Sequence, residues 1–362
     1  MTAMRRLAAS FITVALAAGL AAPAHAQAPI QLTPPAPQQP AIKPAAKPAP
    51  RKSIPTEAVP VAPTPPPAPL TGGSRREADL AYGAFQRGFY MTAFAIATRR
   101  VNEKSDVKAM TLLGELYANG LGVQRDDKKA AEWYRLAADR GDREAMFSLA
   151  LLHLSARVDG TNNREQGAKL LAAAAKLGHA GAAYDLGVLY LEGQAFPQDF
   201  ARAAELFRSA AQAGSPEAQY ALATLFKEGR GVPRDLAEAA RLLAAASLAD
   251  HTDAQVEYAI ALFNGSGTAR NEATAVVLLK KAARKGNAVA QNRLANVLAI
   301  GRGVPADPVE AIKWHIVAKA GGVSDIPLDS YAEKQTAEVR AAAEKAAKPW
   351  LDALKEARES RS

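Results

Sequence analysis

The sequence predicts an all-α protein built as a solenoid of stacked antiparallel helical hairpins. Three observations predict it: an alanine-led pattern that recurs every 36 or 37 residues, glycine and Asp/Asn signals at fixed places in each repeat, and small residues where helices must meet. The chain has 362 residues, a length that suits two ordinary domains or one elongated array. It has no cysteine, which excludes disulfides, thiolate metal sites and a cysteine nucleophile.

The first 26 residues have the layout of a secretory signal peptide. A pair of arginines precedes a weakly apolar run, Leu7–Leu20, and small residues follow at Ala24 and Ala26. The run has 14 residues, fewer than the roughly 20 that cross a bilayer. We therefore expect export to the periplasm, cleavage after Ala26 and no stable membrane span afterwards. The alternative is an uncleaved anchor.

Residues 27–75 are predicted to be a disordered linker rich in proline, alanine and lysine. Residues 27–70 contain 15 of the 23 prolines in the chain, so this stretch cannot bury a core and favours extended polyproline II. Residues 1–76 hold eight Lys/Arg and one acidic residue, whereas residues 77–362 hold 37 basic and 35 acidic residues. Most of the formal net charge of +9 is therefore N-terminal, and the folded part carries no general nucleic-acid footprint. Besides a solvated spacer, the linker could make weak contact with an anionic envelope polymer.

The rest of the chain is dominated by a period near 36 residues. An alanine opens the same pattern at Ala109, Ala145, Ala182, Ala218, Ala254 and Ala290. We expect six repeats with the bounds 109–144, 145–181, 182–217, 218–253, 254–289 and 290–325. A fixed period of this length is typical of a solenoid of small helical units, each of which depends on its neighbours for a core.

Each repeat is expected to contain two helices. With the leading alanine as position 1, small or apolar residues at positions 1, 5, 8 and 9 form one face of a first helix. Glycine is predicted to end this helix because it adopts left-handed φ at low cost. The glycines concerned are Gly120, Gly193, Gly229, Gly265 and Gly301.

Asp or Asn at position 18 is predicted to cap the second helix by accepting from its free amides. These caps are Asp126, Asn163, Asp199, Asp235, Asn271 and Asp307. The second helix is predicted to end at glycine, with Asp250 as a tolerated left-handed substitute in the fourth repeat. The glycines are Gly141, Gly178, Gly214, Gly286 and Gly322.

At these residues the chain resembles the Sel1-like repeat family, a relative of the tetratricopeptide repeats. The pattern A-x-x-x-L-G-x-L-Y…G-x-G-V…D…A…A-A-x-x-G covers about 109–325. The second copy lacks the Gly-x-Gly turn, and the third has Ala195 in place of the second glycine. The resemblance implies a right-handed superhelix whose first helices line a concave face.

The repeats are expected to be closed at both ends. Residues 76–108 resemble a degenerate tetratricopeptide-type hairpin and are predicted to be the N-terminal cap. Residues 326–362 are predicted to form C-terminal capping helices, with a helical pattern that is broken at Pro349.

No catalytic residue, metal site or cofactor is predicted. Four histidines remain after the expected cleavage, and none has HExxH or other metal-ligand spacing. His153 stands where other repeats have Tyr or Phe and is interpreted as a core residue. His251 lies near two carboxylates, but it falls in a turn between repeats, and no GxSxG nucleophile motif occurs. We therefore expect a protein that is not an enzyme.

Positions 3, 7 and 10 share a helical stripe that differs from the core stripe, and we expect them on the concave face. The candidate partner-binding residues are Phe147, Leu151, Leu154, Tyr184, Val188, Leu191, Tyr220, Thr224, Lys227, Val256, Ile260 and Phe263. Tyr184 and Tyr220 are favoured because tyrosine joins apolar area to a hydrogen-bonding tip. The alternative is that these side chains pack between adjacent first helices and are mostly buried.

The sequence thus predicts an exported, non-enzymatic scaffold or adaptor that binds a protein or peptide partner in the cell envelope through its concave face. The resemblance suggests envelope signalling or exopolysaccharide production as the process served. One alternative is a module that binds peptidoglycan or polysaccharide with help from the basic linker. Another is a cell-wall or β-lactam hydrolase, which the missing cysteines argue against, because the helical-repeat relatives linked to β-lactams are cysteine-rich.

Overall fold

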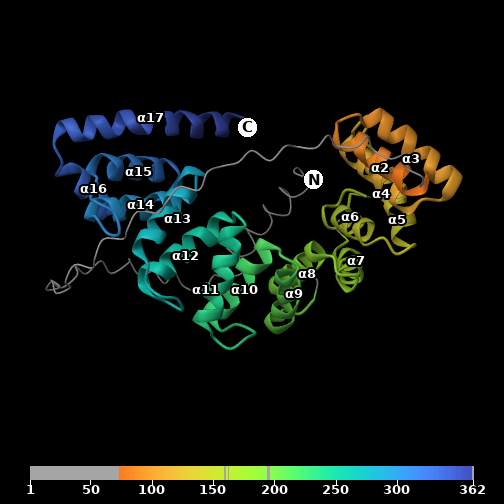
Figure 1. The fold of residues 1–362 in the computed structure, drawn as a ribbon, viewed down its shortest axis with the longest axis horizontal. Coiled ribbons are helices and arrows are strands. Elements are labelled where there is room, and N and C mark those ends of the chain that lie inside the picture. The colour runs from red at the N-terminus through yellow and green to blue at the C-terminus, as the bar shows by residue number, and fades with distance from the viewer. Residues whose placement is uncertain (1–72, 159, 162, 194–195, 361–362) are drawn as a thin grey trace, which may run out of the picture.

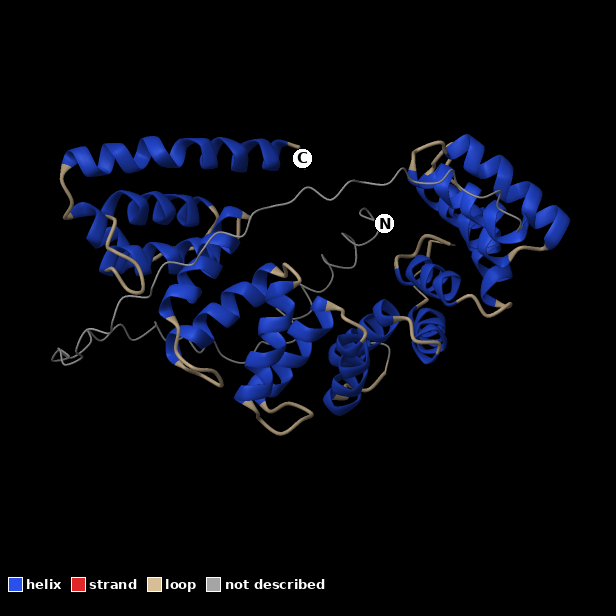
Figure 2. Cartoon of the chain, in the orientation of Figure 1, coloured by secondary structure: helices blue, strands red, loops and turns tan. Residues whose placement is uncertain are grey.

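The computed structural model describes residues 73–158, 160–161, 163–193 and 196–360. The signal peptide and nearly all of the linker predicted above lie outside the described residues. The described chain forms sixteen α-helices and no strand (Figure 2). The helices follow one another along an arc in chain order (Figure 1). The predicted all-α solenoid of helical hairpins is therefore confirmed.

Seven first helices alternate with seven second helices, and each second helix packs between the first helix before it and the element after it. The first helices are α2 (Gly73–Gln86), α4 (Val107–Asn119), α6 (Arg143–Leu154), α8 (Ala180–Glu192), α10 (Pro216–Glu228), α12 (Thr252–Asn264) and α14 (Ala288–Ile300). The second helices are α3 (Tyr90–Lys104), α5 (Asp127–Ala138), α7 (Arg164–Lys176), α9 (Phe200–Gln212), α11 (Leu236–Leu248), α13 (Glu272–Arg284) and α15 (Pro308–Ala320). Two further helices, α16 (Ile326–Glu333) and α17 (Ala337–Glu359), close the C-terminal end.

Both end caps differ in detail from the prediction. Helix α2 begins at Gly73, three residues before the expected start of the cap at 76. Helix α17 runs through Pro349, so the predicted break there is wrong. A proline removes one helical hydrogen bond, but α17 packs along α15, and Trp350 contacts Trp314 with ring centroids 4.8 Å apart. This packing holds the helix together beyond the exposed proline.

The recurring alanine is explained by the caps of the first helices, which the sequence analysis missed. In every repeat the backbone N–H of this alanine donates to the side chain of the residue three positions earlier. The six capping residues are Asp106, Asp142, His179, Ser215, His251 and Asn287. The alanine side chains themselves are buried. A small residue is needed there because the third helical position both closes the cap and packs inside the hairpin.

The start and stop signals predicted within each repeat are confirmed. All six Asp/Asn residues at position 18 accept from an amide of the second helix that they precede. The five glycines that end first helices have φ between 65° and 71°, and Asp250 takes a φ of 70° at the end of α11. Local backbone chemistry therefore sets the helix boundaries of each repeat.

The second glycine of the Gly-x-Gly turn has a further role in joining repeats. A Cβ on Gly267 would lie 1.9 Å from the carbonyl oxygen of Leu236, and a Cβ on Gly231 would lie 2.3 Å from the carbonyl carbon of Phe200. Both contacted residues begin the second helix of the preceding repeat. The turn therefore touches its neighbour through backbone, at a distance that only glycine allows.

An arginine strengthens the same junction in two repeats. The Arg302 guanidinium donates to the carbonyl oxygen of Phe263 at 3.1 Å and to Glu272 at 2.8 Å. In the second repeat, which lacks the Gly-x-Gly turn, Arg157 donates to the carbonyl oxygen of Ala118 at 2.7 Å and pairs with Asp127. A charged side chain can therefore satisfy the carbonyl groups at the end of the preceding first helix.

Candidate functional site

The first helices lie on the more closely spaced side of the stack. Helix α2 contacts α4 and α4 contacts α6, although a second helix separates each pair in the chain. In a curved stack, closer spacing marks the inner side, and Figure 1 shows the stack as an arc. We name "first-helix face" the partly exposed side chains on this side of α4 to α12. They are Glu115, Glu144, Phe147, Leu151, Asp185, Val188, Glu217, Tyr220, Thr224, Lys227, Asp253, Glu257 and Ile260.

Most of the sequence-predicted residues keep some contact with solvent. Eight of the twelve are half-buried, and Lys227 is exposed. The half-buried ones are Phe147, Leu151, Leu154, Val188, Leu191, Tyr220, Thr224 and Ile260. Leu154 and Leu191 at position 10 turn toward the hydrophobic core; a Cβ placed on Gly167 of α7 would meet Leu154 at 2.7 Å. Positions 3 and 7 of these repeats therefore supply the apolar part of the face.

Three candidate residues are in the core, and their prediction as accessible contacts is corrected. Tyr184 is 6% exposed, Val256 4% and Phe263 1%. The Tyr184 ring packs on Phe207 of α9 at 5.5 Å between centroids, inside the hairpin. For these three, the alternative of internal packing is the right one. Tyr184 therefore presents almost no surface to a partner, although its residue type favours contact.

Aromatic side chains at position 3 join neighbouring repeats where the next cap is histidine. Phe147 stacks on His179 at 4.3 Å, and Tyr220 stacks on His251 at 4.8 Å between ring centroids. Each histidine is the N-cap of the next first helix, with Nδ1 accepting from Ala182 N–H at 3.0 Å or from Ala254 N–H at 3.2 Å. In both rings Nδ1 therefore carries no proton. His251 caps α12, which gives a structural reason for a histidine at this position.

Polar side chains also connect one first helix to the next. Glu144 lies 3.2 Å from Nε2 of His179, and Lys227 pairs with Glu257 at 2.8 Å. Asn287 donates to Asp253 at 2.9 Å. These contacts cross from repeat to repeat and define a row of polar groups beside the apolar positions 3 and 7. Most of these acidic residues lie at position 4 or just before the alanine, so they fall outside the stripe at positions 3, 7 and 10 that helical periodicity predicts.

Four carboxylates on this face have no cation within ion-pair distance among the described residues: Glu115, Asp185, Glu217 and Asp253. The pKa is raised in two of them. Burial raises the pKa of Asp185 to about 7, and repulsion by Glu217 on the next first helix adds to it. Burial and the neighbouring Glu144 raise the pKa of Glu115. Each of these two carboxyls is therefore harder to ionise than usual, and a nearby cation would be stabilising.

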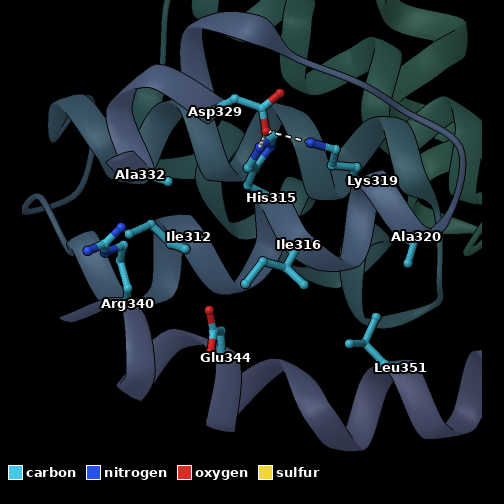
Figure 3. Close-up of a pocket in the computed structure, with 10 residues that line it drawn as sticks. All are labelled: Ile312, His315, Ile316, Lys319, Ala320, Asp329, Ala332, Arg340, Glu344 and Leu351. Carbon is cyan, nitrogen blue, oxygen red and sulfur yellow. Dashed lines mark hydrogen bonds and ion pairs between the residues drawn. The ribbon is translucent and has the colours of Figure 1, made fainter. Parts of the chain in front are cut away.

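A pocket of about 430 Å³ lies between α15, α16 and α17 (Figure 3). His315 and Lys319 both donate to Oδ1 of Asp329 at 2.8 Å, and these contacts lower the pKa of Asp329. The other lining residues are Ile312, Ile316, Ala320, Ala332, Arg340, Glu344 and Leu351. None of the ten side chains carries a hydroxyl or thiol, so the pocket holds no serine, threonine or cysteine that the His–Asp pair could activate.

The described residues offer no cluster of three His, Cys, Asp or Glu side chains that could hold a metal ion. Within the same part of the chain, no helix combines the length and the apolar character needed to cross a bilayer.

Six consecutive segments of the chain match the Sel1 repeat, and the chain belongs to this family. The segments are residues 107–142, 143–179, 180–215, 216–251, 252–287 and 288–323. Each begins at the first residue of a first helix, two residues before the alanine-led boundary used in the sequence analysis. The family's repeat unit therefore coincides with the structural one.

Solved structures agree with this assignment. The crystal structure of a Sel1 repeat protein from Oxalobacter formigenes is 25% identical, covers 67% of this chain and 96% of its own, and superposes with a TM-score of 0.59. The protective antigen c5321 of uropathogenic Escherichia coli displays an SLR fold and is 24% identical to this chain. The match covers 76% of this chain and 68% of the antigen, with a TM-score of 0.51. A comparison with curated proteins finds no match. Sel1 repeat proteins generally act as protein-interaction scaffolds, and their solenoid is generally a non-catalytic fold.

Proposed function

We propose that this chain is exported to the periplasm and acts there as a scaffold or adaptor that binds a protein or peptide partner through the first-helix face. The Sel1 repeats support the general role, and the signal-peptide layout of residues 1–26 supports the compartment. Envelope signalling or exopolysaccharide production is the process that the family resemblance favours.

One observation carries the proposal. Phe147, Leu151, Val188, Tyr220 and Ile260 are half-buried on one side of four consecutive first helices, so part of their apolar surface stays in solvent. A row of partly exposed apolar side chains flanked by polar groups is typical of a surface that binds an amphipathic helix or an extended peptide.

The face ends at the sixth repeat. There the side chains of Asn292 and Asn296 donate to Asp325, the N-cap of α16, at 3.1 and 2.9 Å. The C-terminal cap therefore covers this position, and the contact surface that we propose comprises repeats one to five.

Affinity capture from envelope extracts tests the role of the face. The test variant is Val188→Gln with Ile260→Gln, which removes apolar contact area while keeping side chains compatible with a helix. The matched control is Leu248→Gln with Val277→Gln, because these residues lie on second helices and are 88% and 63% exposed. We expect the control to retain the partner set of the unchanged chain and the test variant to lose it. Equal partner sets from two folded variants would contradict the assignment.

The compartment is tested separately by fractionation and mass spectrometry of the intact protein. We expect the periplasmic fraction to contain a chain whose first residue is Gln27. An uncleaved chain retained in the cytoplasm would contradict export. Sedimentation with purified peptidoglycan tests the alternative that the chain binds cell-wall polymer; the scaffold proposal expects no co-sedimentation.

A further inference from the structure

We propose that the first-helix face binds the chain's own basic segment, residues 43–52, so that an external partner must displace it. This inference rests on the proposed function, because it names what occupies the same face when no partner is bound. It is drawn from charge complementarity, from spacing and from the place where the N-terminal segment joins the repeats.

The charges are complementary. The segment KPAAKPAPRK contains Lys43, Lys47, Arg51 and Lys52 and no acidic residue. The first-helix face has one or more carboxylates in each of repeats one to five, including Glu115, Glu144, Asp185, Glu217 and Glu257. Of these, Glu115, Asp185 and Glu217 have no cation within ion-pair distance among the described residues, so the face has unpaired acidic groups in its middle and at its N-terminal end.

The spacings also agree. Lys43, Lys47 and Arg51 recur every fourth residue. In polyproline II, with its rise of about 3.1 Å per residue, such residues stand about 12 Å apart. Directly packed helices are separated by about 8–10 Å, and consecutive first helices are at least that far apart, so carboxylates that recur once per repeat and the cations of the segment recur on the same scale. The prolines between the cations supply apolar surface, which suits a face that combines carboxylates with half-buried apolar side chains such as Val188 and Tyr220.

The segment is joined to the N-terminal end of the helical stack, within reach of the carboxylates of the face. Residue 52 lies 21 residues before Gly73, where α2 begins, and α2 packs beside α4. A chain of that length reaches up to about 70 Å at roughly 3.3 Å per residue, whereas repeats three and four lie about four helix pairs away, or roughly 40 Å. The segment can therefore reach Asp185 and Glu217 without leaving its own molecule.

A bound lysine or arginine would change the ionisation of Asp185. Burial raises the pKa of Asp185, and repulsion by Glu217 adds to it. A cation placed beside Asp185 favours ionisation of that carboxyl, so binding releases a proton. Occupancy is therefore expected to rise between pH 6 and pH 8 and to fall at high salt, because the Debye length shortens from about 10 Å at 0.1 M to about 3 Å at 1 M.

Carbodiimide cross-linking of the purified full chain tests the proposal, since this reagent joins a lysine only to a carboxylate in direct contact. Mass spectrometry of the monomeric product is expected to find Lys43, Lys47 or Lys52 linked to Asp185, Glu217 or their neighbours on the face. In the variant Asp185→Asn with Glu217→Gln, the yield of links to the remaining face carboxylates Glu144 and Glu257 should fall about fivefold, the ratio expected for the loss of two exposed ion pairs. The control variant, Glu132→Gln with Glu205→Gln on second helices, should leave the yield unchanged.

A nitroxide on a cysteine introduced at position 49 gives a second measurement, because the chain has no cysteine of its own. Its spectrum should show an immobilised label that becomes mobile at 1 M salt and in the Asp185→Asn, Glu217→Gln variant. A mobile label in all cases, or lysine cross-links spread equally over second-helix carboxylates, would overturn the proposal. Cross-links confined to dimers would overturn it too, since the occupant would then be the segment of a second copy. Partner capture that fails only in the Val188→Gln, Ile260→Gln variant would still support the proposed function, so the two can fail separately.

Discussion

The two edges of the repeat stack, where the helices are joined by turns, are built in different ways. At the edge between the first and second helix of one repeat, the second glycine of the turn lies against the backbone of the preceding repeat, and every cap is Asp or Asn. At the edge between repeats, Gly141, Gly214 and Gly286 have no heavy atom within 4 Å of a Cβ position. The caps there are Asp, His, Ser or Asn.

The difference shows where the stack is constrained. The Gly-x-Gly edge carries backbone contact between repeats, so its residues cannot vary in size. The edge between repeats has room, and its caps vary in chemistry while they keep the same hydrogen bond. Packing therefore fixes one edge, and the other is open to residues that respond to pH or contact a partner.

The largest expected effect comes from adding a methyl group at the packed edge. Gly267→Ala places a Cβ against the carbonyl oxygen of Leu236 and keeps a φ of 73° that alanine disfavours. Overpacking and left-handed strain together should lower the free energy of unfolding by about 3 kcal/mol. Urea unfolding followed by circular dichroism measures the change.

Gly214→Ala is the matched change at the open edge. It has a φ of 89° but open space around the Cβ, so only the backbone strain applies, at about 1 kcal/mol. Equal losses from both substitutions would break the comparison, because backbone contact between repeats would then contribute nothing.

The next effect concerns the caps. Asp235 accepts from the amides of Ala237 and Glu238 at 2.9 and 3.0 Å, whereas Ser215 at the open edge accepts only from Ala218, at 3.2 Å. Asp235→Ala should therefore cost about 1–2 kcal/mol of unfolding free energy and Ser215→Ala about 0.5–1 kcal/mol. Hydrogen exchange of the first turn of α11 and of α10 locates each loss. A larger loss from Ser215→Ala would reverse the ranking of the two edges.

The smallest expected effect is the pH response of the histidine caps. Burial lowers the pKa of His251, opposed by Asp253 and by Glu217 on α10 and reinforced by Lys285 after α13. The unfolded chain then binds the proton more readily, so stability is fully present above the unfolded pKa of about 6.5 and falls as the pH drops below it. A cap contributes about 1 kcal/mol, which bounds the loss between pH 7.5 and 5.5.

His251→Asn is the control for this response, since asparagine keeps the cap and does not titrate. Thermal unfolding at several pH values should give this variant a shallower dependence on pH than the unchanged chain. Identical slopes would show that Nδ1 is not a titrating cap.

The fold could be predicted from the sequence because its determinants are local. Gly229 ends α10, Asp235 caps α11 and the alanine of each repeat closes a first helix, all within a few residues of the chain. The uninterrupted α17 could not be predicted, because the contact that holds it past Pro349 comes from Trp314, far away in the sequence.

The candidate site could be predicted only in part. Helical periodicity placed Val188, Tyr220 and Ile260 on the partly exposed side of the first helices, but it did not separate them from Tyr184 and Phe263. Which of these side chains is buried depends on the neighbouring helix. Gly187 leaves room for the Phe207 ring of α9, and Tyr184 packs against this ring in the core. The unpaired state of Asp185 is likewise a property of two adjacent repeats.

The tryptophans of this chain give each end of the solenoid its own optical reporter. Trp314 and Trp350 contact each other under the C-terminal cap, and Trp133, the third in the chain, packs in the first repeat. Repeat arrays can unfold from their ends. Tryptophan emission will therefore record unfolding of the terminal repeats, and far-ultraviolet ellipticity will record unfolding of all the helices. A gap between the two melting curves would therefore measure how cooperatively the terminal repeats are coupled to the central ones.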